Sequence, residues 1–108
     1  KFGWKEVIMT KMATYKPKPT NKIEKDVLFE FYAPAAEDVR LAGTFNHWDP
    51  SKHRLRKESN GRWHLTLKLK LGRYEYRYLV DGNWENDQRP VGCVPNAFGT
   101  WNCVVEVA

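Results

Sequence analysis

The chain has 108 residues and a formal charge of +5 at pH 7, which is enough sequence for one domain with its own hydrophobic core. No apolar run approaches the roughly 20 residues of a membrane-spanning helix, and the first residues do not resemble a signal peptide, so we expect a cytoplasmic protein with no membrane partner. The charge excess lies in residues 1–25, which hold seven lysines and two acidic residues; because nucleic acids bind clustered cations, the balanced remainder predicts no nucleic-acid partner.

Residues 1–25 differ in composition from the rest of the chain. The stretch Lys16–Lys22 is rich in proline and lysine, a composition that predicts an extended, solvated spacer. We therefore expect a basic N-terminal extension or linker over residues 1–25, followed by one folded module over residues 26–108.

From Asp26 onward the apolar residues follow the two-residue period of β-strands. Asn60-Gly61 and Asp81-Gly82 are turn sequences of the kind that joins antiparallel strands. About seven short strands are expected, centred on Val27–Phe31, Val39–Gly43, Leu55, Trp63–Lys70, Tyr74–Val80, Trp84 and Cys103–Val107. This pattern predicts an all-β fold, an immunoglobulin-like antiparallel β-sandwich, with an open barrel as the alternative.

Two of these runs predict which side chains face the core. Trp63 is in phase with the leucines that follow it at every second position, so it is expected in the core. Tyr74, Tyr76 and Tyr78 are expected to line one sheet face, with their hydroxyls reaching water or backbone. Arg77 has the opposite phase and should point outward from the same strand.

Trp48 and Trp84 are large apolar residues in places where polar turn residues are expected. Rings held out on loops by a rigid sheet offer flat platforms for a ligand with an apolar face, and sugars have such a face. The alternative is that one or both indoles close the end of the sandwich. We interpret the pair as a candidate sugar-binding site.

The segments Gly43–Trp48, Gly72–Trp84 and Phe98–Asn102 follow one another along the chain. Together they resemble the starch- and glycogen-binding module family, which includes the glycogen-binding domain of the AMP-activated protein kinase β subunit and the N-terminal domains of branching and debranching enzymes. The likeness covers roughly residues 26–108. It implies an early-set β-sandwich that recognises α-1,4-glucan (glycogen, starch or maltooligosaccharides) and is not itself an enzyme.

The resemblance implies six glucan-binding residues, namely Trp48, Trp84, Arg77, Phe98, Thr100 and Asn102. The two indoles would stack on glucose rings, and Arg77 would hydrogen-bond sugar hydroxyls. Arg77 stands where the family usually has lysine and brings a fork of donors in place of a point charge. The last loop would add an apolar contact from Phe98, which replaces a smaller aliphatic residue, and polar contacts from Thr100 and Asn102. Without the resemblance, Arg77 is better explained as a solvated strand residue. The alternative for Thr100 and Asn102 is that they are turn residues leading into the last strand.

The sequence predicts neither a catalytic site nor a cofactor. A glycosidase needs two carboxyl groups across one cleft, and Asp81, Glu85 and Asp87 are better explained as turn and loop residues. The three histidines lack metal-ligand spacing and there are only two cysteines, so no metal is expected. The expected partners are an α-glucan polysaccharide and an attached or associated catalytic domain.

Cys93 and Cys103 flank the loop that carries Phe98. Two separate reduced thiols are the expected state, and a disulfide bond between them is the alternative.

Two alternative functions are considered beside glucan binding. One is a protein–protein interaction domain of the same fold with a vestigial sugar site, and the other is a binder of single-stranded nucleic acid.

Overall fold

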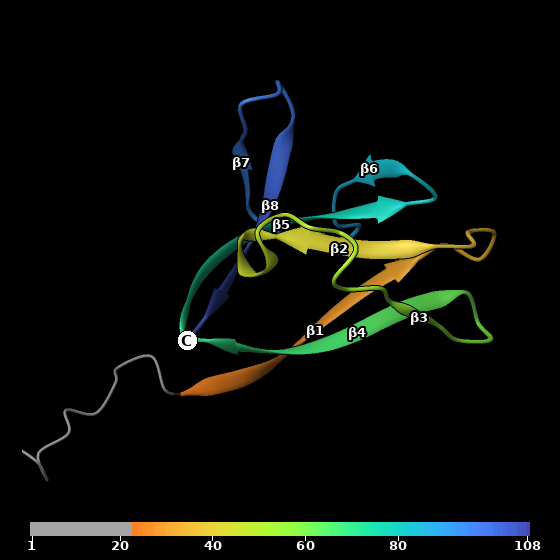
Figure 1. Cartoon of the computed structure of the whole chain (residues 1–108), viewed down its shortest axis with the longest axis horizontal. Coiled ribbons are helices and arrows are strands. Elements are labelled where there is room, and N and C mark those ends of the chain that lie inside the picture. Colours follow the sequence, from red (N-terminus) through yellow and green to blue (C-terminus); the bar gives the residue numbers. More distant parts are fainter. Residues whose placement is uncertain (1–22) are drawn as a thin grey trace, which may run out of the picture.

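The computed structural model describes residues 23–108, which form two antiparallel sheets packed as a sandwich (Figure 1). One sheet has three strands in the order β1-β4-β3, and the other has the order β2-β5-β8-β7 with β6 paired to β5. The strands are β1 (Glu24–Tyr32), β2 (Val39–Gly43), β3 (Arg56–Lys57), β4 (Arg62–Lys70), β5 (Gly72–Val80), β6 (Asn83–Glu85), β7 (Cys93–Pro95) and β8 (Trp101–Val107). A 3-10 turn, η1 (Thr44–Asn46), follows β2.

This architecture confirms the predicted all-β, immunoglobulin-like antiparallel sandwich. The described residues contain eight strands, because Cys93–Pro95 pairs with β8 in addition to the seven regions expected from the sequence. Three residues that include a proline carry too little alternation to signal a strand. The short strand expected at Leu55 lies at Arg56–Lys57 instead, and Leu55 itself is buried in the core. The expected basic extension covers residues 1–25, of which residues 1–22 lie outside the described part of the chain.

Strands β1 and β4 pair along their whole length, from Glu24 opposite Lys70 to Tyr32 opposite Arg62. Their alternation buries the core-facing side chains, and Trp63 is in the core as predicted. The Trp63 indole nitrogen donates to the carbonyl of Ala33 at 2.9 Å, so this large ring is buried with its one polar atom satisfied.

Tyr76 and Tyr78 extend from β5 into the core and join the two sheets. Their rings pack against Phe29 and Phe31 of β1 at centroid distances of 5.2 and 5.0 Å respectively. Such aromatic pairs add about 0.5–1.5 kcal/mol beyond the area that they bury. The contact between the sheets therefore consists largely of rings from these two strands.

The prediction that the tyrosine hydroxyls reach water or backbone is correct only for Tyr74, which donates to the carbonyl of Lys70. The Tyr76 hydroxyl instead donates to the carboxylate of Asp87 at 2.6 Å. The Tyr78 hydroxyl is buried and has no partner among the described residues. The difference arises because β5 lies inside its sheet, so these two rings cross the core rather than lie along an exposed face.

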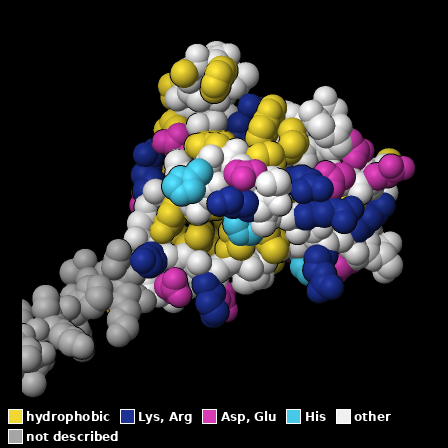
Figure 2. All heavy atoms as spheres, viewed as in Figure 1, with side chains coloured by type: hydrophobic (Ala, Val, Ile, Leu, Met, Phe, Trp, Pro, Cys, Tyr) yellow, Lys and Arg dark blue, Asp and Glu magenta, His cyan; other side chains and the backbone are white. Residues whose placement is uncertain are grey.

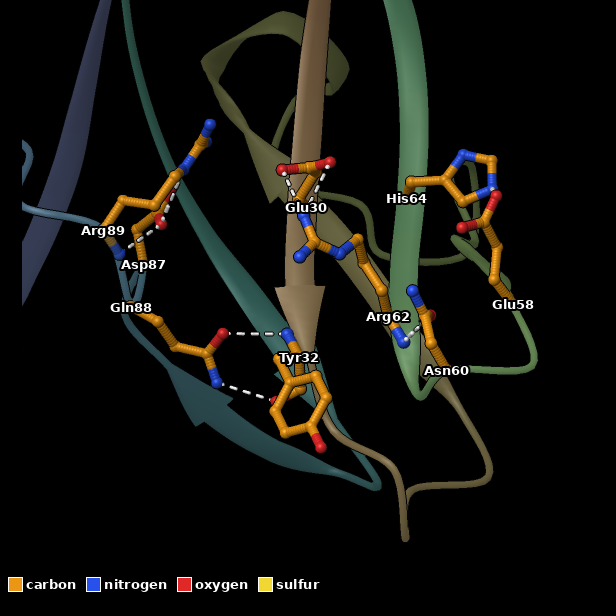
Figure 3. Close-up of polar contacts among 9 residues, drawn as sticks. All are labelled: Glu30, Tyr32, Glu58, Asn60, Arg62, His64, Asp87, Gln88 and Arg89. Carbon is orange, nitrogen blue, oxygen red and sulfur yellow. Dashed lines mark hydrogen bonds and ion pairs between the residues drawn. The ribbon is translucent and has the colours of Figure 1, made fainter.

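The segment after β6 ties the two sheets together at the free edge of β1. The backbone N–H of Asp87 donates to Cys103 Sγ in β8. The side-chain amide of Gln88 accepts from the N–H of Tyr32 and donates to its carbonyl, both at 2.8 Å (Figure 3). This amide therefore pairs with the end of β1 in place of a neighbouring strand. Asp87, which was expected to be only a loop residue, bonds to the core residues Tyr76 and Cys103.

The buried Asp87 carboxylate gives stability that depends on pH. Burial alone would raise the pKa of Asp87, but hydrogen bonds from Arg89 and Tyr76 outweigh it and hold the pKa below its ordinary value. The stabilisation is therefore present above the ordinary aspartate pKa of about 4 and is lost as the pH falls through the lower folded value.

We expect Asp87→Asn to lower the free energy of unfolding at pH 7 by about 2 kcal/mol, because the Tyr76 hydroxyl and Arg89 lose a charged acceptor. The variant should also lose less of its remaining stability than the wild type below about pH 4, as measured by urea denaturation at each pH. The control Asp26→Asn breaks an exposed pair with Lys68 and should cost much less at pH 7 than Asp87→Asn, because solvent screens exposed ion pairs. Equal acid sensitivity of wild type and Asp87→Asn would contradict this assignment.

Candidate functional site

One open groove of about 820 Å³ lies on the outer side of the five-stranded sheet. Its walls come from the turn after η1, from β5 and β6, and from the β7–β8 hairpin, which stands away from the body of the sandwich (Figure 1). The lining residues are Trp48, Glu75, Arg77, Trp84, Asn96, Ala97, Phe98, Thr100 and Asn102. The structure thus brings together all six residues that were named from the sequence.

Trp48 occupies a strained turn. Both His47 and Trp48 have φ of 58°, a left-handed conformation that costs a non-glycine residue about 1–3 kcal/mol. The buried Asn46 holds the turn, because its side chain accepts from the N–H of Gly43 and donates to the carbonyl of Leu41, each at 3.0 Å. The half-buried Trp48 ring is therefore fixed at the groove by an amide anchored in β2.

Trp84 is the central residue of β6 and lies opposite Leu79 of β5. It is 44% exposed and lines the groove. The sequence places it just after a turn, whereas in the structure the ladder of β5 and β6 sets the direction of its ring. Neither Trp48 nor Trp84 belongs to the buried core, so neither one closes the end of the sandwich.

Arg77 points outward from β5, as its phase predicted, and joins two walls of the groove. Its Nε donates to Asn86 Oδ1 at 2.7 Å, and one Nη donates to the Thr100 hydroxyl at 3.3 Å. The second Nη has no partner among residues 23–108 in the structure. The guanidinium is therefore positioned by the protein while one nitrogen stays free for a ligand.

Asn96 shapes the tip of the β7–β8 hairpin. Its Oδ1 accepts from the N–H groups of Phe98 and Thr100 at 2.9 and 3.1 Å, and its Nδ2 donates to Asn102 Oδ1 at 2.9 Å. Gly99 has φ of 78°, which glycine adopts without strain. Phe98 is left 90% exposed at this tip.

Asn102 is only 8% exposed, and both the oxygen and the nitrogen of its side-chain amide form hydrogen bonds. Besides accepting from Asn96, it donates to Glu75 Oε1 at 3.0 Å. The hairpin is thereby joined to β5, and the second carboxylate oxygen of Glu75 lies 4.0 Å from a guanidinium nitrogen of Arg73. Asn102 lines the groove and also shapes it through these two contacts.

Glu75, Asn96 and Ala97 line the groove but were not named from the sequence. Glu75 lies two residues before Arg77 in the same strand and so shares its face, a signal that could have found it. Asn96 starts an Asn-x-x-Gly turn with a side chain that binds its own backbone. Ala97 carries no such signal.

The groove surface is apolar with a few polar groups. Figure 2 shows hydrophobic side chains on the β7–β8 hairpin and beside it, in agreement with the exposed Phe98 and Trp84. Glu75 and Arg77 are the only charged residues among the described lining residues, so their charges balance. This composition suits a neutral ligand with both an apolar face and hydroxyl groups.

The usual groups for glycoside hydrolysis and for metal binding are not found together in the described residues. Glycoside hydrolysis normally uses two carboxyl groups, and the described lining contains one, Glu75. Residues 23–108 contain no cluster of three or more histidine, cysteine or acidic side chains that could hold a metal ion. Within the same residues no helix is long and apolar enough to cross a membrane.

Comparison with known proteins places this geometry in context. The sequence model of the carbohydrate-binding module 48 family (isoamylase N-terminal domain) matches residues 13–97. Protein PTST homolog 2, chloroplastic, of Arabidopsis thaliana is 40% identical over 58 residues, which are 53% of this chain and 11% of that protein. Protein FLOURY ENDOSPERM 6, chloroplastic, of Oryza sativa subsp. japonica is 36% identical over 64 residues, 59% of this chain and 12% of that protein.

A third relative, the 1,4-alpha-glucan branching enzyme GlgB of Trichodesmium erythraeum (strain IMS101), is 44% identical over 61 residues. The match covers 56% of this chain and 8% of that enzyme. The chain thus corresponds to about a tenth of the length of these relatives.

The two cysteines are opposite each other in β7 and β8 and both are free thiols, Cys93 exposed and Cys103 buried. Burial raises the pKa of Cys103, and the thiolate is the reactive form. We therefore expect a thiol reagent to modify Cys93 quickly and Cys103 slowly in the folded chain, and both when the chain is denatured. Cys93→Ser should remove the fast phase alone, and a denatured, unreduced chain without titratable thiols would contradict the expectation.

Proposed function

Because the chain belongs to the carbohydrate-binding module 48 family, we propose that its groove binds α-1,4-glucan, with Trp48 and Trp84 stacking on glucose rings. The ligand is glycogen, starch or a maltooligosaccharide. The observation that carries the proposal is that two indoles outside the core line one groove together with an exposed phenylalanine. The family is one of carbohydrate-binding modules, and the finer assignment of linkage and stacking is ours.

The size of the expected interaction is modest. A sugar ring stacked on an indole removes on the order of 100 Å² of apolar surface from water, or about 2.5 kcal/mol. Each hydrogen bond to a hydroxyl adds about 1 kcal/mol. After the cost of association, two stacked rings and a few hydrogen bonds correspond to roughly micromolar to millimolar affinity.

The polar lining residues divide into two roles. The free nitrogen of Arg77 donates to sugar hydroxyls, and the carboxylate of Glu75 accepts from them, so neighbouring hydroxyls of one ring find both a donor and an acceptor. Thr100 presents its hydroxyl beside Arg77. Asn102 also contacts the glucan in this proposal, and it orients Glu75 and Asn96. Phe98 adds apolar contact from the hairpin tip.

We propose that the module itself is non-catalytic and keeps a polymer near an attached or associated catalytic domain, which raises the effective concentration of substrate. The name of one relative, a 1,4-alpha-glucan branching enzyme, supports this role. A cytoplasmic location stays a prediction, and two relatives have "chloroplastic" in their names.

The second candidate function is a protein–protein interaction domain whose sugar site is vestigial. Phe98 and Trp101 favour it, because both rings are exposed on the β7–β8 hairpin. Such a domain would give no chemical-shift changes in the groove on titration with maltoheptaose, whereas a glucan-binding module would.

We expect Trp48→Ala and Trp84→Ala each to weaken maltoheptaose binding by roughly tenfold to hundredfold, because each removes one stacking surface. Isothermal titration calorimetry measures the affinity. The matched control is Trp101→Ala, which removes an exposed indole that does not line the groove and should leave affinity within about twofold. Unchanged glycogen retention by the Trp48→Ala/Trp84→Ala double variant would refute the proposal.

The neutral groove should also respond little to salt. The affinity of a nucleic-acid binder would fall steeply between 50 and 200 mM salt, by the roughly 10³–10⁵-fold that is typical of proteins with several phosphate contacts. We expect maltoheptaose affinity to change by less than about twofold over this range. A steep salt dependence, or binding of single-stranded nucleic acid in the same groove, would favour the nucleic-acid alternative.

A further inference from the structure

A second, smaller cavity lies at the free edge of β1. It has a volume of about 170 Å³ and is lined by Glu30, Phe31, Tyr32, Arg62, Gln88 and Arg89. None of these residues lines the groove. Figure 3 shows Glu30 and Arg62 on neighbouring strands, the Asp87–Arg89 segment on the other side, and the Tyr32 ring at the end of β1.

The cavity combines an aromatic face with polar groups that have unused hydrogen-bond donors. Tyr32 is 56% exposed, although its backbone N–H and carbonyl both form hydrogen bonds with the Gln88 side chain. One Nη of Arg62 reaches both oxygens of Glu30 at 3.3 Å, a long contact that leaves the rest of this fork free. Arg89 uses Nε and one Nη on Asp87. Each arginine therefore keeps hydrogen-bond donors available.

The charges of this region balance. The guanidinium of Arg62 is paired with Glu30, and that of Arg89 is paired with Asp87. Two cations that are already neutralised by carboxylates do not favour a phosphate or another anion. A neutral ligand with several hydroxyl groups can use both the arginine donors and the Glu30 acceptor.

We propose that this cavity is a second carbohydrate site, which takes one terminal sugar unit of the same neutral polymer. The Tyr32 ring supplies the stacking face, and Arg62, Arg89 and Glu30 bind hydroxyls. This inference rests on the function proposed for the groove. One ring stacked on one tyrosine binds weakly alone, so the site acts through simultaneous engagement of a branched polymer at both positions.

The first test uses the full chain with ¹⁵N labelling and maltotriose as the probe. In the Trp48→Ala/Trp84→Ala double variant, amide resonances of residues 30–32, 62 and 88–89 should still shift and saturate. In the wild type, residues of the groove should shift as well. If only groove residues shift in the wild type and none shift in the double variant, the second site is refuted and the proposed function stands. If no resonance shifts in either protein, both are refuted.

The second test compares binding of a short linear ligand, maltoheptaose, with retention on a branched polymer, glycogen. Tyr32→Ala should reduce retention on glycogen by about fivefold to tenfold while maltoheptaose affinity in the groove stays within about twofold. Arg62→Gln, which keeps the backbone pairing of β1, should act in the same direction. The matched control is Thr66→Ala on the exposed face of β4, which should retain wild-type behaviour. Glycogen retention equal to that of Thr66→Ala in both variants would overturn the proposal.

Discussion

The pleat of β5 is the constraint on which the rest of the structure depends. It sends Tyr76 and Tyr78 into the core and Glu75 and Arg77 to the outer face. The same strand pairs with β2, β6 and β8, and each of these leads into one wall of the groove. A shift of β5 by one residue would exchange core and groove side chains together. Fold stability and the chemistry of the groove are therefore set by one register.

Side-chain amides then fix the parts that the sheets leave free. Asn46 holds the strained turn of Trp48, Asn96 closes the β7–β8 hairpin, and Asn102 joins that hairpin to β5. Gln88 performs the same task at the edge of β1. An amide offers a donor and an acceptor on one planar group, so it can replace a piece of backbone where the ladder ends. Loops that carry a ligand surface can in this way be rigid without further strands.

Both cavities follow the same physical scheme. Each has an aromatic ring with an exposed face, and each has arginine positioned by neighbouring oxygen groups and balanced by a carboxylate. Balanced charge lowers the attraction for anions, while the remaining donors and acceptors suit hydroxyl groups. The excess positive charge of the chain lies in residues 1–25.

The sequence by itself determined the class of fold and six of the residues that line the groove. Alternation identified most strands because one face of each is buried, and it placed Trp63 inside and Arg77 outside. The three segments that resemble the starch- and glycogen-binding modules named six residues that meet at one groove. Only the tertiary structure decided the partners of buried polar atoms, such as the Tyr76–Asp87 bond and the amide bridge from Asn102 to Glu75. Those contacts join residues far apart in the chain, and local periodicity contains no information about which polar groups must pair when two sheets close.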